Sequence, residues 1–387
     1  MRVPLLVLNY NGRRLLEECL PSLAKAAAAS RHDCRVVVID NSSTDDSLDY
    51  LRSAWPEMQI IEQPNRGLCS YNAVLADMDA AGQDGPVAVL LNNDIKLAED
   101  CVDALIEPLL DPPQDSTDDE FAPYDPRETN ACCWMTSALC WRFDGSTYDG
   151  QKTAVRWRHG LVQATSMFPG HQAGIHEAGW TASAGAAIAV RRRTFLELRG
   201  FDPLFLPGRL EDLDLSFRAW QAGYHARHVP AAVAWHLGMG SFSRAFSEAA
   251  CDLLTLRNTL LFQAKNLRHP AHMGRQLAGL PLRLARELLL APIKPASTRW
   301  TLCRALLSAW QSRKQLAAHS RPAGTIADEA EFFHRFHASQ MQAPAASPAS
   351  NSLQARVTIS HQQANHRQHS HAQAAAMESP PTEQLHK

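Results

Sequence analysis

The run Asn92-Asn93-Asp94 has the composition of a site for a divalent cation. It follows the apolar residues 87–91, and a carboxylate flanked by amides at a strand end can coordinate a cation that bridges two phosphates. Oxygen ligands suit Mg²⁺ or Mn²⁺. Only one of the three residues is acidic, so a metal would need a further ligand. The competing interpretation is an aspartate that merely ends a strand.

His236 is a candidate for that further ligand. It follows the short apolar segment 231–235 and precedes Gly238 and Gly240. A neutral imidazole is a good ligand for Mn²⁺. A histidine in such a place can also be structural, and the local sequence leaves both interpretations open.

Two adjacent carboxylates, Glu211 and Asp212, stand just before a segment with helical spacing of apolar residues. Acidic residues in the first turn of a helix are favoured by the helix dipole, so an acidic cap is the simpler account. The preceding turn, from Gly200 to Arg209, is rich in Gly and Pro and would present the pair at one edge. Neighbouring carboxylates push one pKa upward, which suits a general base.

These residues need elements that bring them together. Three apolar runs predict strands buried on both faces, and each run is followed by a polar cluster. The strands and their clusters are 3–8 with 9–11, 36–39 with 40–42, and 87–91 with 92–94. Helical spacing between them predicts an α/β fold with a mostly parallel sheet flanked by helices. Ligands bind such sheets at the carboxyl ends of the strands, so the clusters would share one site.

The chain of 387 residues is 45% apolar and 20% charged, as in an ordinary soluble protein. Its net charge of −2 gives no reason to expect nucleic acid as a partner. The charge is divided unevenly: residues 1–240 carry 21 Lys and Arg against 32 Asp and Glu, and residues 241–325 carry 13 against 3. An acidic first part and a basic second part suggest separate roles.

Several classes are disfavoured by what the sequence lacks. The nine cysteines include no C-x-x-C, so neither a disulfide framework nor a zinc ribbon is indicated. No G-x-G-x-x-G follows the first strand, and no P-loop motif is present. Residues 1–8 are too short for a signal peptide, and no apolar run reaches membrane-spanning length. We therefore expect a cytoplasmic protein.

The basic region 245–320 is expected to be helical. It interleaves Arg283 and Arg286 with leucines between Leu280 and Leu290. Such a surface can lie on an anionic membrane. At the inner face of that membrane the protein would reach a lipid-linked acceptor. The alternative is that these helices pack on the acidic part and balance its charge. Residues 339–387, rich in Ala, Ser, Gln and His, are expected to be a disordered tail.

Taken together, the motifs of this chain resemble those of a family 2 glycosyltransferase of GT-A fold, and most closely those of the rhamnosyltransferase-like bacterial members. Each motif is weak alone, but the ordered set is specific and covers roughly residues 1–265. The motifs are Leu8-Asn9-Tyr10-Asn11-Gly12, Ile39-Asp40-Asn41-Ser42-Ser43-Thr44-Asp45, Asn65-Arg66-Gly67, Leu91-Asn92-Asn93-Asp94, Ser183-Ala184-Gly185, Gly200-Phe201-Asp202, the run Glu211 to Arg218, His236, Arg257-Asn258 and Lys265-Asn266.

The resemblance implies a role for each matching residue. Asp212, with Glu211 beside it, is the catalytic base, and Asp94 and His236 hold Mg²⁺ or Mn²⁺. Gly185 and Trp180 lie on the acceptor side. The residues that would bind the nucleotide sugar are Asn9, Tyr10, Asp40, Arg66, Asn92 and Asn93.

The resemblance also implies a domain plan. Residues 1–242 would form the nucleotide-sugar-binding and catalytic domain, with an irregular, aromatic insertion or acceptor region at 111–180. Residues 243–338 would form a basic helical region before the tail. The chain departs from the family in three places: Asn92 stands where an acidic residue is usual, region 111–180 is long, and Pro207-Gly208-Arg209 replaces an aromatic before the acidic pair.

The implied activity is an inverting transfer of a hexose or deoxyhexose from a nucleotide-diphosphate sugar to a hydroxyl of a glycan or lipid-linked acceptor, in polysaccharide or glycan assembly. One rival is a non-catalytic nucleotide-sugar-binding or scaffold protein on the same fold, although the acidic pair, Asp94 and His236 are all present. Another is a nucleotidyltransferase, which would carry a Gly-rich basic loop after the first strand; residues 9–14 match it poorly.

Overall fold

A mixed β-sheet forms the centre of the structure, which is a computed structural model. It describes residues 1–82, 85–110, 132–238, 246–312, 314–315 and 325–341. These residues belong to one compact unit, Met1–Gln342. Residues 111–131 of the expected insertion and the expected tail from residue 342 onward lie outside the described residues.

The large sheet has the strand order β10-β12-β6-β11-β4-β1-β2-β3, with β5 paired to β12 and β7 paired to β6. Its strands are β1 (Arg2–Asn9), β2 (Asp33–Asp40), β3 (Gln59–Glu62), β4 (Val87–Asn92), β5 (Ile95–Leu97), β6 (Cys133–Trp141), β7 (Tyr148–Gly150), β10 (Gly179–Thr181), β11 (Ala187–Arg191) and β12 (His225–His236). A separate hairpin consists of β8 (Ala154–Arg158) and β9 (Leu161–Thr165).

The predicted α/β fold is confirmed, and its N-terminal half is the parallel part. Strands β1, β2, β3 and β4 are parallel neighbours. In register, Asn9 of β1 lies opposite Asp40 of β2, and Leu8 lies opposite Asn92 of β4. The three polar clusters therefore end at one edge of the sheet. Beyond β4 the sheet is mixed, because β11 runs antiparallel to both β4 and β6.

Alternating side chains of β1 enter two different cores. Leu5 and Val7 pack in the cluster that contains α1 (Arg13–Ala29) and α4 (Cys101–Leu110). Leu6 packs in the cluster that contains α3 (Ser70–Ala80), α6 (Arg192–Glu197) and α7 (Glu211–Gln221). Because successive strand side chains point to opposite faces, a strand apolar throughout is buried on both sides. The short α2 (Ser47–Ala54) follows β2 and precedes β3.

Residues 132–181 are more regular than the sequence led us to expect. Strand β6 is buried along eight of its nine residues and lies between β11 and β12 in the sheet. Its sequence, Cys133 to Trp141, mixes small, polar and aromatic residues and shows no periodicity that marks a strand. The hairpin of β8 and β9 and the short α5 (His171–Gly174) follow it.

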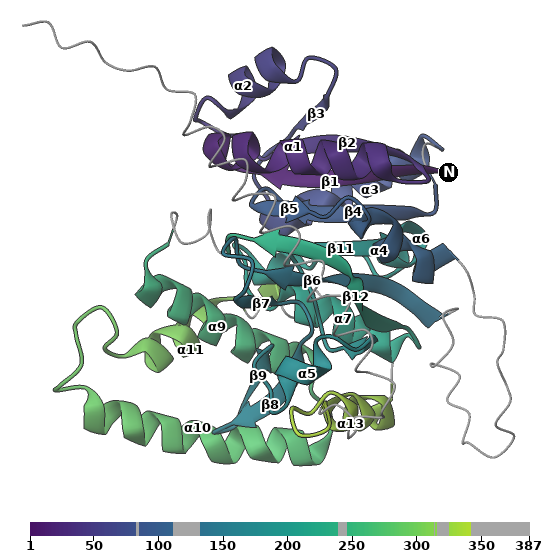
Figure 1. Cartoon of the computed structure of the whole chain (residues 1–387). Coiled ribbons are helices and arrows are strands. Elements are labelled where there is room, and N and C mark those ends of the chain that lie inside the picture. Colours follow the sequence, from purple (N-terminus) through teal and green to yellow (C-terminus); the bar gives the residue numbers. More distant parts are fainter. Residues whose placement is uncertain (83–84, 111–131, 239–245, 313, 316–324, 342–387) are drawn as a thin grey trace, which may run out of the picture. The chain divides into compact units, whose positions relative to one another are not determined.

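The expected helical C-terminal part is confirmed. It contains α9 (Glu248–Asn266), α10 (Pro270–Leu290), α11 (Thr301–Gln311) and α13 (Ile326–Arg335) (Figure 1). Aromatic packing joins α13 to α7, with Phe217 and Phe332 ring centroids 5.0 Å apart. No helix in the described ranges has both the length and the apolar character needed to cross a membrane.

The hairpin of β8 and β9 lies against both α9 and α10. Gln263 of α9 accepts a hydrogen bond from the Val162 amide and donates one to the Gly160 carbonyl. On the α10 side the contact is between backbones: a Cβ added at Gly279 would lie 2.4 Å from the Gly160 nitrogen. Glycine is therefore required at Gly279 for this close approach.

The two glycines of α10 give a matched test of that contact. Gly274→Ala meets nothing within 4 Å and should stabilise the protein by up to about 1 kcal/mol, because alanine is the better helix former. Gly279→Ala gains the same propensity but clashes with backbone, so we expect a net destabilisation of about 1–3 kcal/mol. Urea unfolding of both variants measures this, and equal effects would contradict the backbone contact.

Candidate active site

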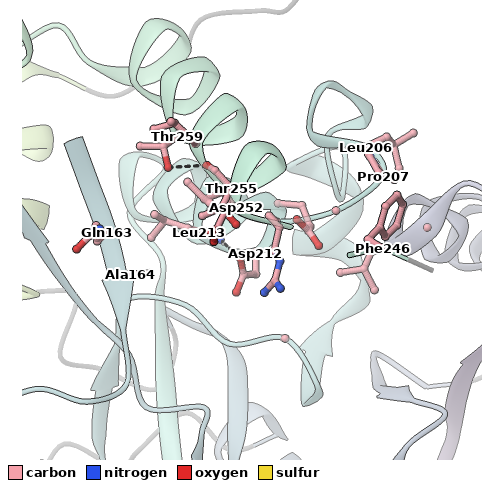
Figure 2. Close-up of a pocket in the computed structure, with 18 of the residues that line it drawn as sticks. Gln163, Ala164, Leu206, Pro207, Asp212, Leu213, Phe246, Asp252, Thr255 and Thr259 are labelled. Atoms are coloured by element: carbon pink, nitrogen blue, oxygen red, sulfur yellow. Dashed lines mark hydrogen bonds between the residues drawn. The ribbon is translucent and has the colours of Figure 1, made fainter. Parts of the chain in front are cut away.

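A cavity of about 1380 Å³ brings most of the candidate residues together. One wall is the strand edge, with Asn9, Tyr10 and residues 92–94, and another is the start of α7, with Glu211 and Asp212. Strand β9, α9 and α10 complete the lining. Figure 2 shows Asp212 beside α9, from which Asp252, Thr255 and Thr259 face the cavity, with Gln163 and Ala164 of β9 on another side.

A buried hydrogen-bond network ties the strand ends to one another. The Asn9 amide donates to the Asp40 carboxylate over 3.0 Å and accepts from the Asn93 amide over 2.8 Å. Ser43 donates to the same carboxylate through both its hydroxyl and its backbone amide. A Cβ at Gly12 would lie 2.1 Å from the Asn93 amide nitrogen, so this glycine leaves room for the network.

The predicted nucleotide-binding residues fall into two groups, those that line the cavity and one that lies behind its wall. Tyr10 and Arg66 are exposed and line the cavity, and Asn92 and Asn93 line it from the end of β4. Asp40 is fully buried and does not line the cavity itself, but it accepts a hydrogen bond from Asn9, which does. Its carboxylate therefore positions the Asn9 side chain.

Asp94 and His236 are brought together by the pairing of β5 with β12, in which His236 lies opposite Ile95. The imidazole Nε2 lies 3.2 Å from Asp94 Oδ1, and both side chains are nearly buried. The imidazole Nδ1 is hydrogen-bonded to Asp149, which also pairs with Arg142. Burial alone would lower the pKa of His236, but hydrogen bonds to the Asp149 and Asp94 carboxylates raise it to about 9. The two carboxylates thus favour positive charge between them.

This pair fits a divalent cation. The buried Nε2 atom of His236 and the Asp94 carboxylate lie side by side, so one cation could contact both. A carboxylate that holds the other imidazole nitrogen is the arrangement by which proteins orient a metal-binding histidine. The described part of the chain contains no group of three or more acidic, His or Cys side chains suited to a metal. The protein would therefore supply two ligands, an oxygen and a nitrogen.

Glu211 and Asp212 begin α7, directly after a backbone in an unusual conformation. Arg209 and Leu210 have φ of 85° and 68°, in the left-handed region that non-glycine residues rarely adopt. Desolvation raises the pKa of both carboxylates, and for Glu211 the neighbouring Asp212 raises it further. The Glu211 Oε2 atom is buried and has no hydrogen-bond partner within the described ranges. The pair is thus poised to take up a proton.

Helix α9 holds that loop in place. The Asn258 amide lies within 2.7–2.9 Å of the carbonyl oxygens of Phe205, Gly208 and Arg209. Arg257 donates to the Leu206 carbonyl over 3.0 Å. These bonds satisfy the carbonyls of a loop that forms no regular structure, which stabilises the strained conformation.

Further along α9, a buried charge cluster fixes α7. Lys265 contacts Asp202 at 2.6 Å and Asp214 at 2.8 Å, and Asn266 donates to Asp214. Arg218 also pairs with Asp214, and these cations lower the pKa of that carboxyl despite its burial. Asp214 is thus structural, whereas Glu211 and Asp212 line the cavity.

On the acceptor side, the structure brings one predicted residue to the cavity and not the other. A Cβ at Gly185 would lie 3.8 Å from Asp212 Oδ2. Trp180 instead stacks on His225, with ring centroids 5.0 Å apart, and packs against Trp220. It does not line the cavity, because β10 pairs with β12 on the far side of β6.

Sequence reasoning missed two contributors to the site. Asp149, which orients His236, comes from β7, in the region that we expected to be irregular. Gln151 lines the cavity and accepts hydrogen bonds from the amides of Gly185 and Ala186. Neither lies in a motif that marks it. By contrast, Arg257-Asn258 and Lys265-Asn266 appeared among the motifs, but nothing in the sequence indicated what they hold.

Comparison with known proteins confirms the resemblance. Residues 5–166 match the model of the Glycosyl transferase family 2. No curated protein sequence matches the chain. Similar solved structures include GalNAc-T7 with UDP, GalNAc and Mn²⁺ (16% identity, TM-score 0.47, 87% of this chain and 56% of that one). The chain thus spans little more than half the length of that protein.

Two microbial structures are also similar. The mannosyltransferase PcManGT of Pyrobaculum calidifontis, in complex with GDP-Man and Mn²⁺, is 17% identical with a TM-score of 0.44, over 85% of this chain and 78% of that one. TarS 1–349 of S. aureus, in complex with UDP-GlcNAc, is 14% identical with a TM-score of 0.47, over 88% and 93%.

The raised pKa of Glu211 predicts a pH-dependent stability difference. An acid whose pKa is higher in the folded state favours folding while it is protonated, and this contribution is lost as the pH rises. For Glu211 the loss spans the range from its ordinary value of 4.5 to about 8. We expect Glu211→Gln to gain unfolding free energy relative to wild type across that range, measured by urea unfolding. The exposed Glu57→Gln is the control, and parallel trends in the two variants would refute the argument.

Proposed function

We propose that this chain, whose residues 5–166 match the Glycosyl transferase family 2 model, moves a sugar from a nucleotide-diphosphate sugar to a hydroxyl acceptor with inversion. One observation carries the proposal. A single cavity is lined both by the Asp94–His236 pair at the strand edge and by the carboxylates of Glu211 and Asp212. The groups proposed for the donor and for the acceptor therefore line one cavity.

The strand edge is the donor side in this proposal. Tyr10 would stack on or flank the nucleobase, Asn92 would contact the ribose, and Arg66 would approach the base or the diphosphate. Asn93 and Asn9 hold this edge in shape through their mutual hydrogen bond, with Asp40 behind them. A Mg²⁺ or Mn²⁺ ion held by Asp94 and His236 would neutralise charge that grows on the departing nucleoside diphosphate.

Asp212 is the proposed general base. A hydroxyl near neutral pH is a poor nucleophile, and removal of its proton as the bond forms typically accelerates a reaction by about 10²–10⁴-fold. The raised pKa of Asp212 suits a base that must accept a proton near neutral pH. Glu211, with its pKa also raised, would keep a proton and leave the negative charge on its neighbour. A single displacement at the sugar carbon inverts its configuration.

Three variants test this assignment against a panel of uridine, thymidine and guanosine diphosphate sugars with Mn²⁺ or Mg²⁺. Asp94→Asn should lose metal-dependent binding of the nucleoside diphosphate, measured by thermal shift. Asp212→Asn should bind it but lose about 10²–10⁴-fold of donor turnover, measured as slow hydrolysis. Asp252→Asn, a carboxylate of the same cavity without an assigned role, is the control. Normal turnover by Asp212→Asn would remove the base from the proposal.

We also propose that the C-terminal helices contact an anionic membrane, where a lipid-linked acceptor would be found. Large apolar side chains are exposed along α10 and just after it: Leu277, Leu282, Leu288, Leu289 and Ile293 are 60–79% exposed. Basic residues of the same stretch, among them the exposed Arg275, alternate with them. Apolar anchors beside cations complement a membrane with anionic headgroups.

Vesicle binding by the full chain tests this contact. Leu289→Gln with Ile293→Gln removes the two most exposed anchors and should weaken binding to anionic vesicles at least about tenfold, because each buried side chain contributes roughly 1.5–3 kcal/mol. Met167→Gln, an exposed apolar residue after β9, is the control. Unchanged sedimentation of the double variant would show that these helices serve another purpose.

A further inference from the structure

The cavity has a third wall that the donor and the catalytic pair do not use. It is built from the hairpin of β8 and β9 and from α10, and it continues into the segment after that helix. Four cationic side chains line it: Arg156, Arg283, Arg286 and Lys294. We call this set the cationic wall.

The cationic wall is held in place by the hairpin. Arg283 donates to the carbonyls of Arg158 and His159 over 2.7 Å and 2.9 Å, at the turn that meets Gly279. Arg286 follows one helical turn later and lines the same cavity. Arg156 is steadied by Gln163 across the hairpin, over 3.2 Å. Three of the four cations thus stand on regular elements, and Lys294 lies in the segment that follows α10.

The charges of this wall are not neutralised by neighbouring carboxylates. Arg156, Arg283, Arg286 and Lys294 form no ion pair within the described ranges. Glu287 is close in sequence, but its buried carboxylate accepts the amides of Leu302 and Cys303 at the start of α11. Burial and then the charges of Arg158 and Arg286 lower the pKa of Arg283. Mutual repulsion of this kind is relieved when an anion binds.

We propose that the cationic wall binds a phosphate or diphosphate group of the acceptor. This rests on the proposed function, because it assigns the donor diphosphate to the strand edge and leaves the wall for the second substrate. A neutral glycan does not need four cations, whereas arginines recognise phosphate through paired N–H donors and lysine adds a point charge. The acceptor would then carry its hydroxyl toward Asp212 and its phosphate toward α10.

Direct binding tests the assignment without knowledge of the acceptor. The probes are inorganic pyrophosphate and farnesyl diphosphate, titrated calorimetrically into the full chain in the presence of a chelator so that the donor site holds no metal. The test variant is Arg286→Gln with Lys294→Gln. The matched control is Arg275→Gln with Arg304→Gln, two exposed cations of α10 and α11 that do not line the cavity.

We expect the test variant to bind both probes about tenfold more weakly or worse, because a hydrogen bond to a charged group contributes roughly 1.5–3 kcal/mol. The control should bind as wild type does, and thermal unfolding of both variants verifies folding. Tighter binding of farnesyl diphosphate than of pyrophosphate identifies a lipid-linked acceptor, and equal binding identifies a water-soluble phosphorylated one. Equal losses in test and control variants, or no loss in the test variant, would overturn the proposal.

A separate titration keeps the two proposals apart. Nucleoside diphosphate with Mn²⁺ should bind the test variant as well as it binds wild type, because the donor residues are intact. If wild type fails to bind any nucleoside diphosphate, the proposed function fails, while the pyrophosphate result still decides whether the cationic wall is an anion site.

Discussion

The buried contact of Lys265 with Asp202 and Asp214 is the constraint on which the site depends. Charges removed from water are tolerated only when they are paired and hydrogen-bonded, and here one ammonium meets two carboxylates while Asn266 and Arg218 satisfy the remaining oxygens. This cluster fixes α9 against α7. Other α9 residues then set the remaining walls: Asn258 holds the loop before Glu211, and Gln263 holds the hairpin of β8 and β9.

The sequence alone predicted the parts of the site whose residues lie close together in the chain. Parallel strands end at one edge, so the clusters after β1, β2 and β4 had to meet, and an acidic pair before a helix had to sit at its start. It could not predict the residues that antiparallel or long-range strand pairing brings to the site. Asp149 and Gln151 reach the site because β7 pairs with β6, whose own sequence shows no strand periodicity. Trp180 is the opposite case. It is an aromatic residue near the motifs, but the pairing of β10 with β12 places it against His225 rather than in the cavity.

The uneven charge of the chain has a partial structural explanation. If the basic helices simply balanced the acidic part, their cations would pair with its carboxylates. Lys265 does so with Asp202 and Asp214. Arg283 instead contacts backbone carbonyls, and within the described residues Arg286 and Lys294 form no ion pair. Charge balance therefore accounts for Lys265 of α9, whereas Arg283 and Arg286 of α10 line the cavity.

The two kinds of charge in one cavity constrain each other. Asp212 is half-buried, and in its ionised form it repels any anion that approaches the base. An acceptor with a phosphate would be excluded unless cations offset that field on its path, and the cationic wall stands on the same cavity. The reverse also holds, because cations in a low-dielectric space favour the ionised form of a nearby carboxylate. In our proposal the acidic base and the cationic wall would therefore serve one substrate, with a hydroxyl at one end of the molecule and an anionic group at the other.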